Sequence, residues 1–227
     1  MRLGTYAAAG TGDQTPPANL HAMTPTRLEA FSDGVLAIAI TLLVLDIHVP
    51  LPRPGTSLAD QLGAQWPSYV AYLTSFLTIG IIWINHHAMI RRLRAVDHTI
   101  LTLNLLLLLT IGVLPFTTAL VAAYVKQGHG QHLAAAIYAG SYLLMSIAFA
   151  ATNRHILFAK TKLHLVALPE HERRSILRRG VVGLAPYLIA TALAAVSAYA
   201  TLAICAAVAV FYALPRTTAD SAAQKAA

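Results

Sequence analysis

Long apolar segments, each close to the length that crosses a bilayer, constrain the fold of this chain more than any other feature. A helix needs ~20 apolar residues to cross the hydrocarbon core. Six such segments can be drawn, at about residues 28–49, 66–87, 99–125, 133–152 and twice within the uncharged stretch 180–214. As one helix that last stretch would extend about 52 Å, too far for one crossing, so we place a break near residues 197–201. The pattern predicts an all-α integral membrane protein with six transmembrane helices per subunit.

Local signals mark where these helices begin and bend. Thr26 followed by Glu29 forms a capping-box pattern, which predicts the start of the first helix. Pro115 and Pro186 lie inside the third and fifth segments. Proline is tolerated within membrane helices as a kink, so we expect a bend near each of them.

The composition agrees with a membrane protein and excludes several other classes. Of the 227 residues, 57% are hydrophobic and only 11% are charged, whereas soluble domains average about 25% charged residues. A single cysteine, Cys205, excludes a disulfide framework and a cysteine-rich metal site. We expect Cys205 to be an ordinary core residue. The net charge of +7 would fit a nucleic-acid partner, but the placement of the charges argues against one.

Lysine and arginine are distributed very unevenly between the two ends of the predicted helices. With six spans and a cytoplasmic N-terminus, only Arg53 and Lys126 of the 16 basic residues fall on the outer side. Positive residues concentrate in cytoplasmic loops of membrane proteins. We therefore predict a multi-pass protein of the cell membrane with both termini cytoplasmic. A five-span arrangement would leave Arg216 and Lys225 outside and fits this rule less well.

Three parts of the chain are expected outside the membrane. Residues 1–23 are predicted to form a disordered tail, with Met1 or Met23 as the true start, and residues 216–227 a short cytoplasmic tail. Between them, residues 24–215 form the six-helix domain, which contains a basic cytoplasmic loop at 153–179. Ordinary positive-inside charge explains this loop, although it could also contact anionic lipid headgroups.

The first predicted helix combines ionisable groups with an apolar stripe. Arg27, Glu29, Ser32 and Asp33 precede a short apolar run, and Asp46 follows it. Charged groups at such depth are costly and usually face a bundle interior or an ion pathway. At 100° per residue, Ile38, Leu42 and Leu45 fall within about 60° of one another, while Asp33 lies about 140° from Ile38. The stripe either packs against a neighbouring helix or lipid, or lines a pore.

Polar residues of the second and third helices lie at a depth similar to that of Ser32 and Asp33. His86 and His87 end the second segment, and Asn104 begins the third. Adjacent residues point apart on a helix, so both histidines cannot face one metal ion, and we expect no metal site. One histidine can reach Ser32 or Asp33. Interfacial snorkelling of the histidines and plain helix–helix hydrogen bonding of Asn104 are the simpler alternatives.

No motif of a common enzyme or filter is present in the sequence. The Gly-Lys-Ser/Thr phosphate loop, the Gly-x-Ser-x-Gly elbow and the His-Glu-x-x-His zinc motif are absent. The Thr-Val-Gly-Tyr-Gly potassium filter is absent too. We therefore expect no catalytic residues, no cofactor and no enzyme activity.

The first helix resembles the signature helix of the transmembrane protein 175 family of potassium channels. The matching residues are Arg27, Phe31-Ser32-Asp33, Ile38 and Thr41-Leu42-Leu43-Val44-Leu45-Asp46. Trp83-x-x-His86-His87, Asn104 and Pro115-Phe116 are similar to later motifs of the family. The resemblance covers residues 24–215, and six spans match the prokaryotic members.

The resemblance implies a homotetramer whose first helices line a central pore for K⁺. Ile38, Leu42 and Leu45 would form a hydrophobic constriction, and Thr41 would tune the preference for potassium. A polar network would hold the first helix against the second and third. Its members would be Arg27, Phe31, Ser32, Asp33, His86, His87 and Asn104, with the choice between the two histidines open.

The function expected on these grounds is a potassium-permeable channel with modest selectivity for K⁺ over Na⁺. The main alternative is a proton channel or proton-coupled transporter that uses Asp33 with His86 or His87. A membrane-embedded enzyme would need a third convergent ligand at the same depth, and Asn104 is the only candidate. A non-conducting structural protein is the last alternative.

Overall fold

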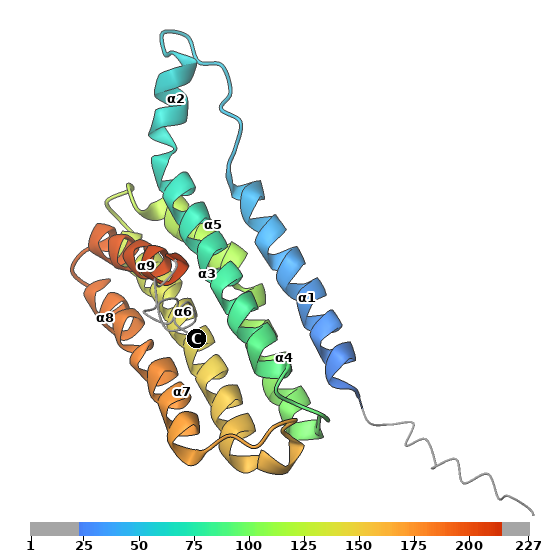
Figure 1. Ribbon diagram of the computed structural model, residues 1–227. Coiled ribbons are helices and arrows are strands. Elements are labelled where there is room, and N and C mark those ends of the chain that lie inside the picture. Colours follow the sequence, from blue (N-terminus) through green and yellow to red (C-terminus); the bar gives the residue numbers. More distant parts are fainter. Residues whose placement is uncertain (1–22, 215–227) are drawn as a thin grey trace, which may run out of the picture.

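The computed structural model describes residues 23–214 as a bundle of α-helices (Figure 1). Helix α1 continues into a 3-10 turn, Leu43–Asp46, and a π-helical turn, His155–Ala159, follows α6. The helices are α1 Pro25–Leu42, α2 Leu58–Ala64, α3 Trp66–Ile90, α4 His98–Gly112, α5 Leu114–Tyr124, α6 Gln131–Arg154, α7 Glu170–Val182, α8 Ala185–Leu193 and α9 Ala198–Ala213. The predicted all-α class is confirmed, while both predicted tails lie almost entirely outside the described residues.

Within residues 23–214, five helical stretches are long and apolar enough to cross a membrane. They are Pro25–Asp46, Trp66–Ile90, His98–Tyr124, Gln131–Ala159 and Glu170–Leu193. The remaining apolar helix, α9, has 16 residues. At 1.5 Å per residue α9 is about 24 Å long, shorter than the ~30 Å hydrocarbon core. The sixth span predicted from the sequence corresponds to α9, and its crossing of the membrane stays a prediction.

Helix breaks occur just before both of the prolines singled out in the sequence. Helices α4 and α5 are separated at Val113, two residues before Pro115, and α7 and α8 are separated at Gly183 and Leu184, just before Pro186. Proline lacks a backbone N–H and its ring clashes with the preceding turn, so the regular helix is interrupted there. Two of the membrane-spanning stretches therefore consist of two helical pieces each.

Two boundaries differ from the sequence-based prediction. The cap of α1 is Thr24, whose hydroxyl accepts a hydrogen bond from the backbone N–H of Arg27 at 3.3 Å, rather than Thr26. Pro25 explains the difference because its fixed φ suits the first helical position. The last break lies at residues 194–197 instead of 197–201, because Ser197 caps α9 by accepting from the N–H of Ala200 at 3.2 Å.

The expected basic loop at 153–179 is mostly helical. Residues 153–159 extend α6, and residues 170–179 begin α7. Pro169 precedes α7, and two acidic residues lie in its first turn. Arg174 pairs with Glu170, one turn earlier, at 2.5 Å. Acidic side chains near a helix N-terminus and pairs four residues apart both stabilise a helix. The irregular connection is therefore confined to residues 160–169.

That connection is attached to the loop between α3 and α4. Leu93 forms an isolated antiparallel bridge with His164. Lys160 pairs with Asp97 at 2.7 Å, and the same carboxylate caps α4 by accepting from the N–H of Ile100 at 2.9 Å. Burial raises the pKa of Asp97, but the hydrogen bonds and the Lys160 charge outweigh it and the pKa is lowered overall.

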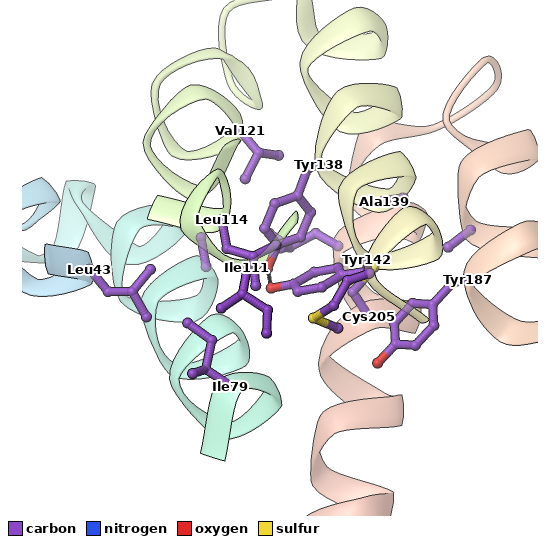
Figure 2. Close-up of a cluster of buried hydrophobic side chains, with 14 of the residues drawn as sticks. Leu43, Ile79, Ile111, Leu114, Val121, Tyr138, Ala139, Tyr142, Tyr187 and Cys205 are labelled. Atoms are coloured by element: carbon purple, nitrogen blue, oxygen red, sulfur yellow. Dashed lines mark hydrogen bonds between the residues drawn. The ribbon is translucent and has the colours of Figure 1, made fainter. Parts of the chain in front are cut away.

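The core centres on α6, which packs against α4, α5, α8 and α9. Figure 2 shows Tyr138 and Tyr142 of α6 among apolar residues of the neighbouring helices, with Cys205 beside them. The buried hydroxyl of Ser75 in α3 lies 2.7 Å from the hydroxyls of both Thr118 and Tyr142. Three helices thus share one buried hydrogen-bonded cluster, and Cys205 is fully buried as expected.

Replacing Gly130 with alanine is expected to destabilise the protein by more than the about 1–2 kcal/mol that a left-handed backbone alone costs a residue with a Cβ. Gly130 has φ +72°, and a Cβ there would lie 3.0 Å from the Tyr124 ring. Gly128 is the matched control, since it has the same φ of +72° with nothing within 4 Å of its Cβ position. Thermal unfolding of both variants in detergent measures the effect. Equal losses would show that the contact with Tyr124 contributes nothing.

Candidate ion pathway along α1

Helix α1 lies along one side of the bundle, where it packs against α3 and α4 (Figure 1). Its inward face is built from residues spaced three or four apart, which places them on one side of the helix. These buried residues are Leu28, Ser32, Leu36, Ala39 and, in the following turn, Leu43. Because α1 contacts the subunit through this face alone, its opposite face is left uncovered.

The apolar stripe identified in the sequence lies on the uncovered face. Ile38, Leu42 and Leu45 are 61%, 44% and 67% exposed. Phe31 of α1 is also exposed, and so is Val49, which lies beyond the 3-10 turn that follows the helix. The stripe is therefore not packed against another helix of the described subunit, so lipid, a second subunit or a pore must cover it. Thr41 is exposed beside the stripe, and its hydroxyl donates to the Ile38 carbonyl at 2.9 Å.

A buried polar cluster fixes the inward face of α1. The amide nitrogen of Asn104 in α4 donates to the Ser32 hydroxyl oxygen at 3.0 Å, and its carbonyl oxygen lies 2.7 Å from Nε2 of His86 in α3. This arrangement requires the proton on Nε2. All three side chains are at most 1% exposed. The Nδ1 atom of His86 is buried without a hydrogen-bond partner among the described residues. Ser32, Asn104 and His86 thus join three helices at one point.

The other polar residues expected in this network are placed differently. The carboxylate of Asp33 accepts a hydrogen bond from the Trp83 indole at 2.9 Å and makes none with a histidine of the described part of the chain. His87 pairs through Nδ1 with Glu29, one turn before Asp33. Two polar bridges between α1 and α3, one helical turn apart, therefore lie beside the buried cluster. Arg27 is exposed, like Phe31.

Trp83 and Glu29 are the partners that sequence reasoning missed. The sequence predicts Trp83 only as part of a motif, and Glu29 as a capping-box residue and a polar group near the start of the first helix. Trp83 lies three and four residues before His86 and His87, and Glu29 lies four before Asp33. Residues at these spacings share a helix face. The spacing is therefore the signal in the sequence that predicts Trp83 and Glu29 beside the polar residues already named.

A shallow apolar groove runs beside the Asp33–Trp83 bridge. Its volume is about 330 Å³, and α1 and α3 form its walls with residues such as Ala37, Ile40 and Gly80. Within residues 23–214, no group of three or more His, Cys, Asp or Glu side chains is placed to hold a metal ion. Together with the exposed stripe, the groove makes the α1 side of the bundle a suitable surface for another apolar helix.

Comparisons with known proteins agree with this arrangement. A family profile described as "Endosomal/lysosomal potassium channel TMEM175" matches residues 27–115, which contain α1, the polar cluster and Pro115. A potassium channel of Streptomyces collinus is 48% identical over 130 residues, which cover 57% of this chain and 63% of that protein. A potassium channel of Chamaesiphon minutus is 40% identical over 190 residues, which cover 83% of this chain and 93% of that protein.

Similarity extends to an animal protein and to a solved structure. The endosomal/lysosomal proton channel TMEM175 of Mus musculus is 40% identical over 122 residues, which cover 50% of this chain but only 24% of the mouse protein. The crystal structure of a lysosomal potassium-selective channel TMEM175 homolog from Chamaesiphon minutus superimposes with a TM-score of 0.74 at 37% identity. The match covers 83% of this chain and 96% of that one. The fold, the first-helix motif and the near full-length relative agree, and the chain belongs to the TMEM175 family of ion channels, not to a family of enzymes.

Proposed function

We propose that this protein is a potassium-permeable channel that assembles as a homotetramer around its α1 helices. The observation that carries the proposal is the apolar stripe of α1, which is exposed although the opposite face of the helix is anchored by a buried polar cluster. One helix cannot enclose a hole, but four copies around an axis can. The channel relatives in Streptomyces collinus and Chamaesiphon minutus support this assignment.

In the proposed tetramer, four Ile38 side chains surround the axis at one level, with Leu42 and Leu45 at further levels. A hydrophobic ring of this kind gates by excluding water. An ion that crosses the ring must lose part of its hydration shell. Potassium holds its shell less tightly than sodium, because its charge is spread over a larger radius, so K⁺ passes more easily. The resulting selectivity is modest, and the Thr41 hydroxyl beside the stripe would tune it.

The remaining parts of the proposal concern topology and partners. The subunit crosses the cell membrane six times, with α9 as the last span and both termini cytoplasmic. The positive-inside distribution of lysine and arginine supports this orientation. Ser32, Asp33, His86, His87 and Asn104 keep α1 in position, with His86 rather than His87 in the buried cluster, whereas Arg27 and Phe31 are exposed. Potassium is the permeant ion, and no cofactor takes part.

Proton conduction is the second candidate, favoured by the proton-channel name of the mouse relative. Asp33, the Glu29–His87 pair and the buried His86 are the ionisable groups between α1 and α3. Protonatable groups inside a membrane often form relays. The half-buried position of Asp33 beside the α1–α3 groove leaves it accessible for such a role.

Flux through the purified full-length protein in liposomes tests both candidates. Native mass measurement should show four copies, and K⁺ flux should exceed Na⁺ flux. The variant Asp33→Asn keeps an oxygen that accepts the Trp83 hydrogen bond but cannot carry a proton. We expect its tetramer and K⁺ flux to remain. If K⁺ does not permeate, or if the conducting species is a monomer, the proposal is wrong. Proton flux that disappears in Asp33→Asn while K⁺ flux persists would add proton conduction through Asp33.

A further inference from the structure

A second cavity lies on the other side of the bundle from the α1 stripe. Its volume is about 720 Å³, and residues of α3, α6, α7 and α9 line it together with Arg92. The stretch Glu170–Leu193 borders this cavity. Only 11% of the residues in its 18-residue apolar window are buried inside the subunit, the lowest share among the five candidate spans. Helix α7 packs on α6, so a space is left between α7 and α3. The volume is within the ~300–1,000 Å³ range of small-molecule sites.

Three polar residues are among those that line this cavity. Arg92, in the loop after α3, and Arg179 of α7 both line it. Neither arginine belongs to the ion pairs formed within residues 23–214. Asn153 of α6 also lines the cavity, is only 5% exposed, and has its side-chain oxygen buried without a hydrogen-bond partner among the described residues. Two guanidinium groups and an unpartnered amide oxygen thus belong to the wall of one cavity.

The positive charge of Arg92 is only partly compensated by the residues around it, which suits a site that binds an anion. Burial lowers the pKa of Arg92, and the charge of Glu172 opposes this effect. Glu172 nevertheless forms no ion pair with Arg92 among the described residues. A partly buried guanidinium is usually satisfied by a carboxylate or a phosphate, often through two hydrogen bonds.

The rest of the cavity is lined mainly by apolar side chains and runs along α3. Ile82, Ala88, Met145 and Phe149 are part of its wall. On α3 the lining extends from Met89, next to Arg92, back to Thr78. From Arg92 to Thr78 the rise is about 21 Å at 1.5 Å per residue, roughly two-thirds of the hydrocarbon thickness. A free anion would use only the basic end, whereas an amphiphile would use the whole length.

We propose that this cavity binds one anionic phospholipid, with its phosphate between Arg92, Arg179 and Asn153 and an acyl chain along α3 and α6. Basic pockets between transmembrane helices on the cytoplasmic side are typical sites for anionic headgroups. The buried side-chain oxygen of Asn153 accepts a hydrogen bond from a hydroxyl group of the headgroup, such as that of a glycerol. The proposal is independent of which ion the channel conducts.

Lipid binding to the purified full-length channel tests the proposal. Phosphatidylglycerol is titrated in detergent and followed by native mass spectrometry and thermal unfolding, with phosphatidylcholine and inorganic phosphate as comparisons. We expect phosphatidylglycerol to bind and to raise the melting temperature, and the two comparisons to do so far less. The double variant Arg92→Gln/Arg179→Gln should weaken binding by about tenfold or more, since a hydrogen bond to a charged group is worth that much.

Two further variants make the test specific. Arg178→Gln removes an exposed charge next to Arg179 that does not line the cavity, so its binding should change less than about twofold. Ala88→Phe fills the apolar part without changing any charge and should also weaken lipid binding. Equal losses for Arg178→Gln and the double variant would overturn the proposal, because they would indicate diffuse attraction to the basic surface. Equal binding of phosphatidylcholine, or an equal effect of inorganic phosphate, would overturn it too.

Discussion

Replacing Ile38 with asparagine is expected to lower the potassium-to-sodium permeability ratio towards unity. In the proposed tetramer, four amides then stand where four branched alkyl groups excluded water. Amides can hydrogen-bond to water and to a partly hydrated ion, so the constriction becomes wet more easily. The dehydration penalty that separates Na⁺ from K⁺ shrinks, and Na⁺ flux rises more than K⁺ flux. Paired K⁺ and Na⁺ flux measurements in liposomes give the ratio directly.

The control for this experiment is Ile38→Val, which shortens the side chain but keeps the ring apolar, so selectivity should be largely retained. If the stripe instead packs against another helix, Ile38→Asn buries amides without partners, at about 1–3 kcal/mol each. Loss of folded protein, not altered selectivity, would then be the result. A folded Ile38→Asn tetramer with an unchanged permeability ratio would exclude Ile38 as the constriction.

Replacing Asn104 with leucine is expected to loosen α1 from α3 and α4. Leucine has a similar size but provides neither the donor to Ser32 nor the acceptor for His86. His86 would then have no partner on either ring nitrogen, since its Nδ1 already lacks one within the described part of the chain. A buried polar group without a partner costs about 1–3 kcal/mol. We expect a clear drop in the melting temperature of the detergent-solubilised protein and in tetramer yield.

Thr102 of the same helix provides the matched control. It is exposed, and its hydroxyl bonds only within α4, to the His98 carbonyl at 3.0 Å and to the His98 ring. Thr102→Val should therefore leave stability and tetramer yield close to those of the parent protein. If Asn104→Leu is as stable as Thr102→Val, the buried cluster does not hold α1.

The sequence predicted the apolar helices well because length and hydropathy alone identify them. It placed bends near Pro115 and Pro186, where the structure interrupts the helices. It missed the first half of α7, since a helix with four arginines and two glutamates has no apolar signal. Its stability depends on Pro169, the Glu170–Arg174 pair and packing on α6, and hydropathy reports none of these.

The candidate site was predicted only in part, since Trp83 and Glu29 were not expected in it, and the expected Arg27 and Phe31 are exposed. Ser32, Asn104 and one histidine were expected to meet because they lie at the same depth. The choice between His86 and His87 depends on the rotation of α3 about its axis, since consecutive residues point about 100° apart. That rotation is fixed by the packing of the whole bundle. The same rotation directs Trp83 towards Asp33, whereas the sequence prediction left open whether a histidine would reach Ser32 or Asp33.

The 3-10 turn that follows α1 has a consequence for the shape of the proposed pore. In an α-helix, residues three apart are offset by about 60°, whereas in a 3-10 helix they eclipse one another. Leu42 ends α1 and Leu45 lies within the turn Leu43–Asp46. The two leucines are therefore nearly in line along the helix axis, about 6 Å apart at the larger 3-10 rise. A permeating ion would pass two successive rings of leucine side chains that are aligned along the pore axis. Because the rings are not offset from one another, no lateral space for water would lie between them.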